Sequence, residues 1–170
     1  MRLVPEEHRE GKADTNVNAD ENDVPTGRIE LTRENRDGLL HRYLLLVPES
    51  YDPARRYPVG VYLHGGVGRP DPGPGGGWWR NTERVASEDQ IAVLPLSTRE
   101  SLWWQASQVE NLNAILTELK RTYNVDENRV FASGVSDGGT GAYFLSFRDT
   151  TPWAGFLPLI GYPGVLLNPR

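Results

Sequence analysis

The fold of this chain is decided by Gly134-Val135-Ser136-Asp137-Gly138, which lies between a β-prone segment and a run of small residues typical of the start of a helix. The β-prone segment is 128–133, and the small residues continue to position 142 before bulkier apolar ones follow. A serine in a G-x-S-x-G pattern sits on a sharp strand-to-helix turn, because the flanking glycines leave room for the backbone to bend. The pattern therefore predicts that the Ser136 hydroxyl points outward as a nucleophile. The alternative is a glycine-rich turn that serves only packing or anion contact.

A second glycine-rich segment, His-Gly-Gly-Val-Gly at 64–68, follows the apolar run 57–63, which is typical of a buried strand. In α/β serine hydrolases a loop of this H-G-G type donates a backbone N–H to the oxyanion hole, and the residue after the nucleophile donates another. Here the donors would be near Gly66 or Val67, and at Asp137. The pairing of the two motifs about 70 residues apart strengthens the prediction for both.

With these motifs the chain resembles the α/β-hydrolase fold, and within it the bacterial esterases related to polyhydroxybutyrate depolymerases, feruloyl esterases and acyl-peptidase-like hydrolases. The resemblance extends from about residue 39 to residue 170. It implies an α/β fold with a mostly parallel sheet and flanking helices, and hydrolysis of carboxylic esters through an acyl-enzyme on Ser136. Two alternatives are a serine peptidase of the same fold and a catalytically silent module that binds a ligand or partner in the same cleft. The resemblance rests on segments 43–48, 62–66, 123–130 and 134–139.

Composition limits the other functions. The 170 residues are 38% hydrophobic with five Trp and seven Tyr, enough for one packed domain. A net charge of −5, with no basic cluster longer than Arg55-Arg56, argues against nucleic acid or an anionic membrane as partner and favours a small neutral or apolar substrate. The resemblance implies that this substrate is a small-molecule or polymer ester. No cysteine, metal-ligand cluster, phosphate loop or dinucleotide fingerprint is present, so no metal or cofactor is expected. No run is apolar enough for a membrane span or secretory leader, which makes a cytoplasmic location the default and leaves secretion of a longer parent open.

The chain divides into a polar arm and a hydrolase-like part. Residues 1–26 carry seven acidic and three basic side chains and no aromatic residue, which predicts a flexible arm. Residues 27–170 are expected to form the N-terminal part of an α/β-hydrolase domain. It would begin with a hairpin of 28–33 and 41–48 around Asp37-Gly38, although two unrelated loop segments would also fit.

The remaining elements alternate between strands and helices. Helix-forming residues at 78–89 precede an apolar strand at 91–96, and 154–161 predicts another strand. Apolar residues at steps of three and four predict an amphipathic helix over 108–122. Such alternation builds a parallel sheet with helices on both faces, and it places Ser136 at the carboxyl end of its strand, where α/β sheets bind ligands.

No residue of this chain fits the base that Ser136 needs. In the α/β-hydrolase order, the serine is followed by an acid and then by a histidine, yet His8, His41 and His64 all precede Ser136. Asp149 comes one strand too early for the acid. We therefore expect the triad acid and base to lie in sequence not given, and the chain to be inactive alone and to self-associate through an exposed sheet edge. A complete but minimal protein is the alternative.

Four tryptophans follow the predicted strands. Trp78 and Trp79 come after the 64–68 loop, and Trp103 and Trp104 after the strand at 91–96. All four would therefore lie on loops at the sheet edge that carries Ser136. They could form an aromatic wall for substrate, or they could cap the core beneath long loops.

Overall fold

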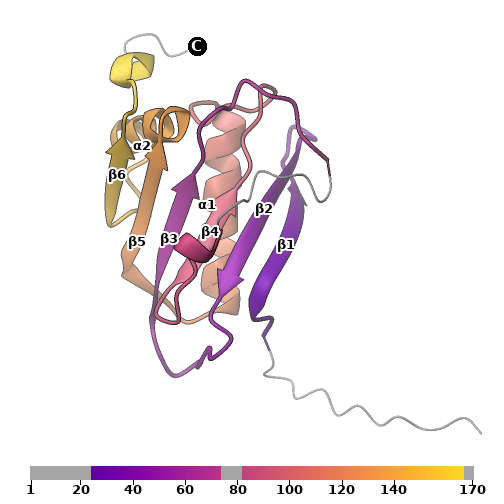
Figure 1. Ribbon diagram of the computed structural model, residues 1–170, viewed down its shortest axis with the longest axis vertical. Coiled ribbons are helices and arrows are strands. Elements are labelled where there is room, and N and C mark those ends of the chain that lie inside the picture. The colour runs from indigo at the N-terminus through magenta and orange to yellow at the C-terminus, as the bar shows by residue number, and fades with distance from the viewer. Residues whose placement is uncertain (1–23, 74–81, 167–170) are drawn as a thin grey trace, which may run out of the picture.

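The computed structural model describes residues 24–73 and 82–166. Six strands form a single sheet in the order β1-β2-β4-β3-β5-β6 (Figure 1). The predicted α/β fold, with a mostly parallel sheet and flanking helices, is confirmed. The elements are β1 (Gly27–Glu34), β2 (Leu40–Val47), β3 (Tyr57–Leu63), η1 (Thr82–Arg84), β4 (Ile91–Pro95), α1 (Ala106–Thr122), β5 (Val125–Val135), α2 (Asp137–Arg148), β6 (Gly155–Leu159) and η2 (Pro163–Leu166).

The predicted N-terminal hairpin is confirmed. Strands β1 and β2 pair antiparallel, with Gly27 opposite Val47 and Glu34 opposite Leu40. Gly38 has a φ of 81°, a left-handed conformation that glycine adopts without steric cost, and its N–H donates to the carbonyl of Asn35. Strand β2 also pairs antiparallel with β4, so the hairpin extends a parallel sheet of β4, β3, β5 and β6.

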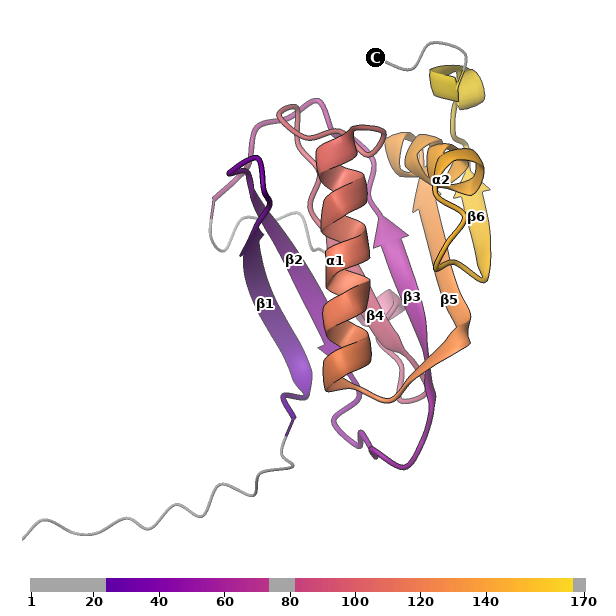
Figure 2. The same ribbon diagram turned by 180° about the vertical axis from the view of Figure 1, so that it is seen from behind.

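Both helices lie on the same face of this sheet, behind it in Figure 1 and in front of it in Figure 2. The expectation of helices on both faces is therefore not met by α1 and α2. The reason is topological: the connections β4-α1-β5 and β5-α2-β6 both step toward the β6 edge, and right-handed crossovers in the same direction cover the same face. The connection from β3 to β4 steps the other way. Its described helical turn, η1, accordingly lies on the opposite face (Figure 1).

The predicted helix at 78–89 is wrong where the structure describes it. In residues 82–89 the only helical element is the 3-10 turn η1. A local side-chain contact competes with helix formation there, since the Ser87 hydroxyl accepts the backbone N–H of Asp89 at 3.1 Å. Trp78 and Trp79, and residues 1–23 of the predicted arm, lie outside the described residues.

The core lies between α1 and the sheet. Helix α1 confirms the predicted amphipathic helix and begins two residues earlier. Its buried polar residue Gln108 is satisfied by the carbonyls of Leu96 and Ser101, at 2.8 and 3.2 Å. No helix among residues 24–73 and 82–166 is long and apolar enough to cross a membrane. The almost fully buried apolar residues of α1 and the central strands include Leu112, Ile115, Leu116, Leu119, Val59, Val61, Ile91, Val93, Val130 and Ala132.

Candidate active site

Ser136 forms the turn between β5 and α2. Its backbone has φ 58° and ψ −120°, a conformation that non-glycine residues rarely adopt and that costs on the order of 1–3 kcal/mol. The surrounding structure holds it there: the Ser136 N–H donates to the carbonyl of Leu159 on β6, and its own carbonyl accepts the N–H of Thr140. The residue is exposed at the carboxyl end of β5, where the sequence predicts it.

The glycines around Ser136 are required by space. A Cβ on Gly138 would overlap the Leu63 carbonyl group, lying 2.5 Å from its carbon, and a Cβ on Gly134 would lie 2.8 Å from the Gly138 Cα. A Cβ on Gly139 would come within 3.0 Å of the Gly161 Cα. These glycines let α2 start in direct contact with the ends of β3 and β6, which fixes where Ser136 stands.

The 64–68 loop lies beside Ser136. A Cβ on Gly65 would lie 3.7 Å from the Ser136 Oγ. The backbone N–H groups of Gly66 and Val67 both donate to Oδ2 of Asp137, at 2.9 and 3.1 Å. The structure thus brings together the residues that the sequence assigns to the oxyanion hole. It also shows that the two loop amides bind the Asp137 side chain, a contact between residues some 70 positions apart for which no local sequence signal exists.

His64 holds this loop and uses both ring nitrogens to do so. Its Nε2 lies 3.0 Å from the backbone N of Ser97 and must accept that N–H. The proton is therefore on Nδ1, which donates to the carbonyl of Gly65 at 2.9 Å. Burial lowers the pKa of His64 and so favours this neutral form. With its lone pair directed at Ser97, His64 is not arranged to take a proton from Ser136.

His41 and Asp149 also lie away from the serine. The His41 ring is buried, its Nε2 is 3.0 Å from both the Asn35 amide nitrogen and the Ser107 hydroxyl, and burial lowers its pKa. Asp149 accepts a 2.8 Å hydrogen bond from the Asn113 side chain at the far end of α2, about 18 Å along a 12-residue helix from Ser136. Among the described residues, no side chain hydrogen-bonds the Ser136 hydroxyl as a base would.

The two described tryptophans take different positions. Trp103 is completely buried; its Nε1 donates to the His64 carbonyl at 2.9 Å, and its ring meets the His64 ring edge to face at 5.2 Å. It packs so tightly under α2 that a Cβ on Gly141 would lie 2.9 Å from its Cγ. Trp103 thus caps the core beneath the loop and has no exposed surface for substrate. Trp104 is half-buried.

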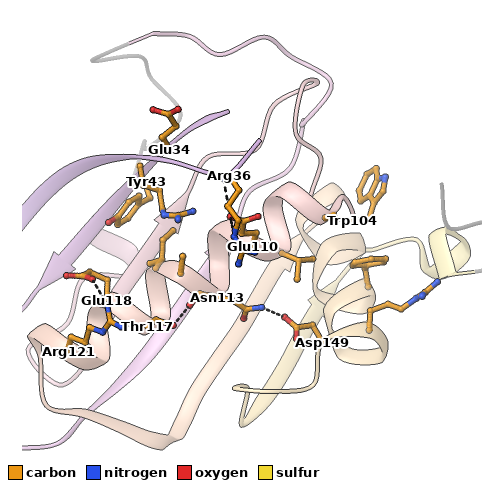
Figure 3. A pocket seen from close by; sticks show the side chains of 17 residues that line it. Glu34, Arg36, Tyr43, Trp104, Glu110, Asn113, Thr117, Glu118, Arg121 and Asp149 are labelled. Carbon is orange, nitrogen blue, oxygen red and sulfur yellow. Dashed lines mark hydrogen bonds and ion pairs between the residues drawn. The ribbon is translucent and has the colours of Figure 1, made fainter. Parts of the chain in front are cut away.

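Trp104 borders a groove of about 1200 Å³ that runs along the outer side of α1 (Figure 3). Oppositely charged side chains cross it, including the pairs Arg36–Glu110 and Arg121–Glu118 at 3.5 and 3.9 Å. Ser136 and the 64–68 loop are not among its lining residues. No group of three or more His, Asp or Glu side chains in the described parts of the chain is arranged to hold a metal ion.

Comparison with known proteins shows which solved structures share this fold. No protein-family model matches the sequence, and neither does any curated protein. Among solved structures, a thermostable esterase superposes with a TM-score of 0.64 at 26% identity, over 79% of this chain and 40% of the esterase. A Bacteroides ovatus protein assigned as a dipeptidyl aminopeptidase IV gives 0.59 at 24% identity, over 75% and 20%. The substrate-bound serine hydrolase FphF of Staphylococcus aureus gives 0.64 at 16% identity, over 85% and 61%. The chain spans less than two thirds of each of these proteins, and it has the α/β-hydrolase-like fold that esterases and other serine hydrolases share.

Proposed function

We propose that this chain carries the nucleophile of a serine hydrolase that cleaves small or polymeric carboxylic esters through an acyl-enzyme on Ser136. The observation that supports the proposal is the strained backbone of Ser136, at φ 58° and ψ −120°, in a turn whose neighbouring glycines have no space for a side chain. A nucleophile elbow has this construction, because the sharp turn lifts the serine hydroxyl clear of the sheet at the start of a helix. Ser136 is exposed there, as a nucleophile that meets substrate must be.

The oxyanion hole of this enzyme would be formed by backbone amides. We assign one donor to Asp137, the residue after the nucleophile, and the other to Gly66 or Val67. The 64–68 loop lies close enough for this role, since Gly65 is adjacent to the Ser136 side chain. Both loop amides bind the Asp137 carboxylate in the structure, so they can serve a substrate only when that contact opens.

The acid and base that activate Ser136 would come from outside residues 1–170. His64 and His41 both use Nε2 in contacts that do not involve Ser136, and the carboxylate after the motif, Asp149, lies at the other end of α2. A serine hydroxyl without a base is a poor nucleophile at neutral pH. Residues 1–170 alone are therefore expected to show trace turnover at most.

An ester substrate is favoured over a peptide by the likeness to the thermostable esterase, which extends over 79% of this chain at 26% identity. A second candidate function is a catalytically silent module that binds a ligand in the same cleft. The engagement of His64 with Ser97 and Gly65, and of both loop amides with Asp137, favours that candidate.

The test is hydrolysis of a short-chain aryl ester by residues 1–170 and by any longer product of the same gene. In the longer product, Ser136→Ala should lower turnover by about 1000-fold or more. Ser146→Ala is the matched control, because Ser146 lies on α2, the helix that follows Ser136, and its hydroxyl donates to the Tyr143 carbonyl. Retention of more than about a tenth of the turnover in Ser136→Ala would refute the assignment. A longer product with a suitable histidine and no turnover would favour the binding module.

A further inference from the structure

The Gly66 and Val67 amides form a site for an anion that the chain itself fills. We propose that the Asp137 carboxylate is a built-in occupant of this site, and that it competes there with the oxyanion of a bound substrate. The first half of this proposal stands on geometry alone, and the second half rests on the proposed function of Ser136.

The two amides converge on a single oxygen. Gly66 N and Val67 N lie 2.9 and 3.1 Å from the same atom, Oδ2 of Asp137. Gly66 has a φ of 74°, and consecutive N–H groups around a left-handed residue form a concave nest that binds anions. Val67 is almost fully buried and Gly66 is partly buried, which limits the access of water to these donors. Hydrogen bonds from amides to a carboxylate are roughly twice as strong as those between neutral groups.

Further positive potential surrounds the nest. The guanidinium of Arg69 lies against Gly66, where a Cβ would be 3.8 Å from the Arg69 Cζ. Asp137 is also the first residue of α2, a helix of 12 residues whose positive dipole end favours negative charge at that position. The amides, the guanidinium and the helix end all favour an anion at the place where Asp137 Oδ2 lies.

This site adjoins the reacting group of the proposed hydrolase. Gly65, next in the chain to the nest, faces the Ser136 side chain, since a Cβ added at Gly65 would lie 3.2 Å from the Ser136 Cβ and 3.7 Å from its Oγ. A tetrahedral intermediate on Ser136 Oγ would carry its oxyanion toward the same amides. One pair of N–H groups cannot donate fully to two oxygens, so the Asp137 side chain must rotate away as the oxyanion forms. Asp137 then weakens oxyanion binding in the resting state and selects for substrates that bind tightly enough to displace it.

A purely structural clamp predicts something different. If Asp137 only ties the 64–68 loop to α2, its removal frees the loop to move and creates no site for an external anion. If Asp137 occupies an anion site, its removal leaves two oriented amides that an external carboxylate can reach. Acetate, which has the same carboxylate as the missing side chain, distinguishes these cases.

The experiment records ¹H–¹⁵N correlation spectra of residues 1–170 during titration with sodium acetate, with sodium chloride at equal ionic strength as the reference. In Asp137→Ala, the Gly66 and Val67 amide signals should shift saturably, with a dissociation constant about tenfold lower than in the wild type, because a charge-assisted competitor has been removed. Asp126→Ala is the matched control. Asp126 is also a carboxylate bound to a backbone N–H, that of Asn128, and it should leave the wild-type response unchanged.

A well-dispersed Asp137→Ala spectrum with no acetate response at these two amides, or a response equal to that of the wild type, would overturn the proposal. Asp137→Asn provides a second variant that keeps an oxygen acceptor but not the charge. It should bind acetate about threefold or more tighter than the wild type, and equal binding would also overturn the proposal. The readout needs no turnover. A longer product with a suitable histidine and no turnover, together with intact acetate binding, would therefore refute the hydrolase and leave the anion site standing.

Discussion

Gly138→Ala tests the packing that positions Ser136. A Cβ at this position would overlap the carbonyl group of Leu63 at the end of β3, 2.5 Å from the carbon, and would lie 3.0 Å from the His64 carbonyl oxygen. Both obstacles are backbone atoms, which cannot rotate aside as a side chain would. Relief requires α2 and β3 to separate, and the 64–68 loop would move with β3.

The expected loss of stability follows from this overlap. Overpacking a core by one methyl group costs about 1–3 kcal/mol, and the rigid neighbours here favour the upper end. For a chain of this size 1 kcal/mol shifts the melting temperature by about 2–4 °C, so Gly138→Ala should lower it by about 6–12 °C. The matched control is Gly68→Ala in the neighbouring 64–68 loop, because a Cβ there meets no atom within 4 Å. Equal melting temperatures for the two variants would refute the packing around the serine turn.

Three further predictions concern strain, protonation and surface. Ser136→Gly should raise the free energy of unfolding by up to about 1 kcal/mol, because the relief of about 1–3 kcal/mol of backbone strain exceeds the conformational entropy that glycine loses on folding. A lower urea midpoint than in the wild type would contradict the turn geometry. Burial lowers the pKa of His41 and His64 below 6.5 in the folded chain. The unfolded chain therefore binds more protons than the folded chain below that pH. The contribution of the two neutral histidines to the free energy of unfolding is fully present above about pH 6.5 and should be lost as the pH falls below it. Urea midpoints at about pH 7.5 and 5.5 measure this loss, which should be smaller in His41→Gln; a midpoint independent of pH would contradict it. Finally, four apolar side chains are exposed on the same side of β5 and β6: Phe131, Val135, Leu157 and Leu159. Residues 1–170 should therefore self-associate, which a sizing column would detect, and Leu157→Asp should reduce the association. A monomeric wild type would refute this.

Local patterns in the sequence predict most of the elements. The alternation and turn pair around Asp37-Gly38 predict the hairpin, and the spacing of apolar residues from Val109 to Leu119 predicts α1. These signals work because each element buries one face and because the turn needs a glycine at positive φ. The helix expected over 78–89 fails in its described part because the Ser87 hydroxyl competes for a backbone N–H. Composition alone does not record such a contact.

The contacts within the candidate site are harder to predict from the sequence than the helices and strands are. The motif predicts the turn at Ser136, since its glycines are dictated by contacts within a few residues and with the neighbouring strands. The partners of His64 and of the loop amides come from Ser97 and Asp137, which only the folded sheet brings close. Likewise, Trp103 and Trp104 are neighbours in sequence, and only the packing under α2 separates the buried ring from the half-buried one.

For the proposed hydrolase, these contacts imply that two separate changes are needed before the described structure could cleave an ester. A base must reach the Ser136 hydroxyl, and the Asp137 carboxylate must leave the Gly66 and Val67 amides. The first change would raise the nucleophilicity of the serine, and the second would lower the energy of the intermediate, so they act on different terms of the same barrier. Supplying only a base would leave the oxyanion in competition with a carboxylate held by two charge-assisted hydrogen bonds. In an active longer product, Asp137→Ala should therefore raise turnover, because it removes the competitor of the oxyanion. The pH at which the rate rises, which reports the pKa of the base, should stay the same, so the pH–rate profile separates the two effects.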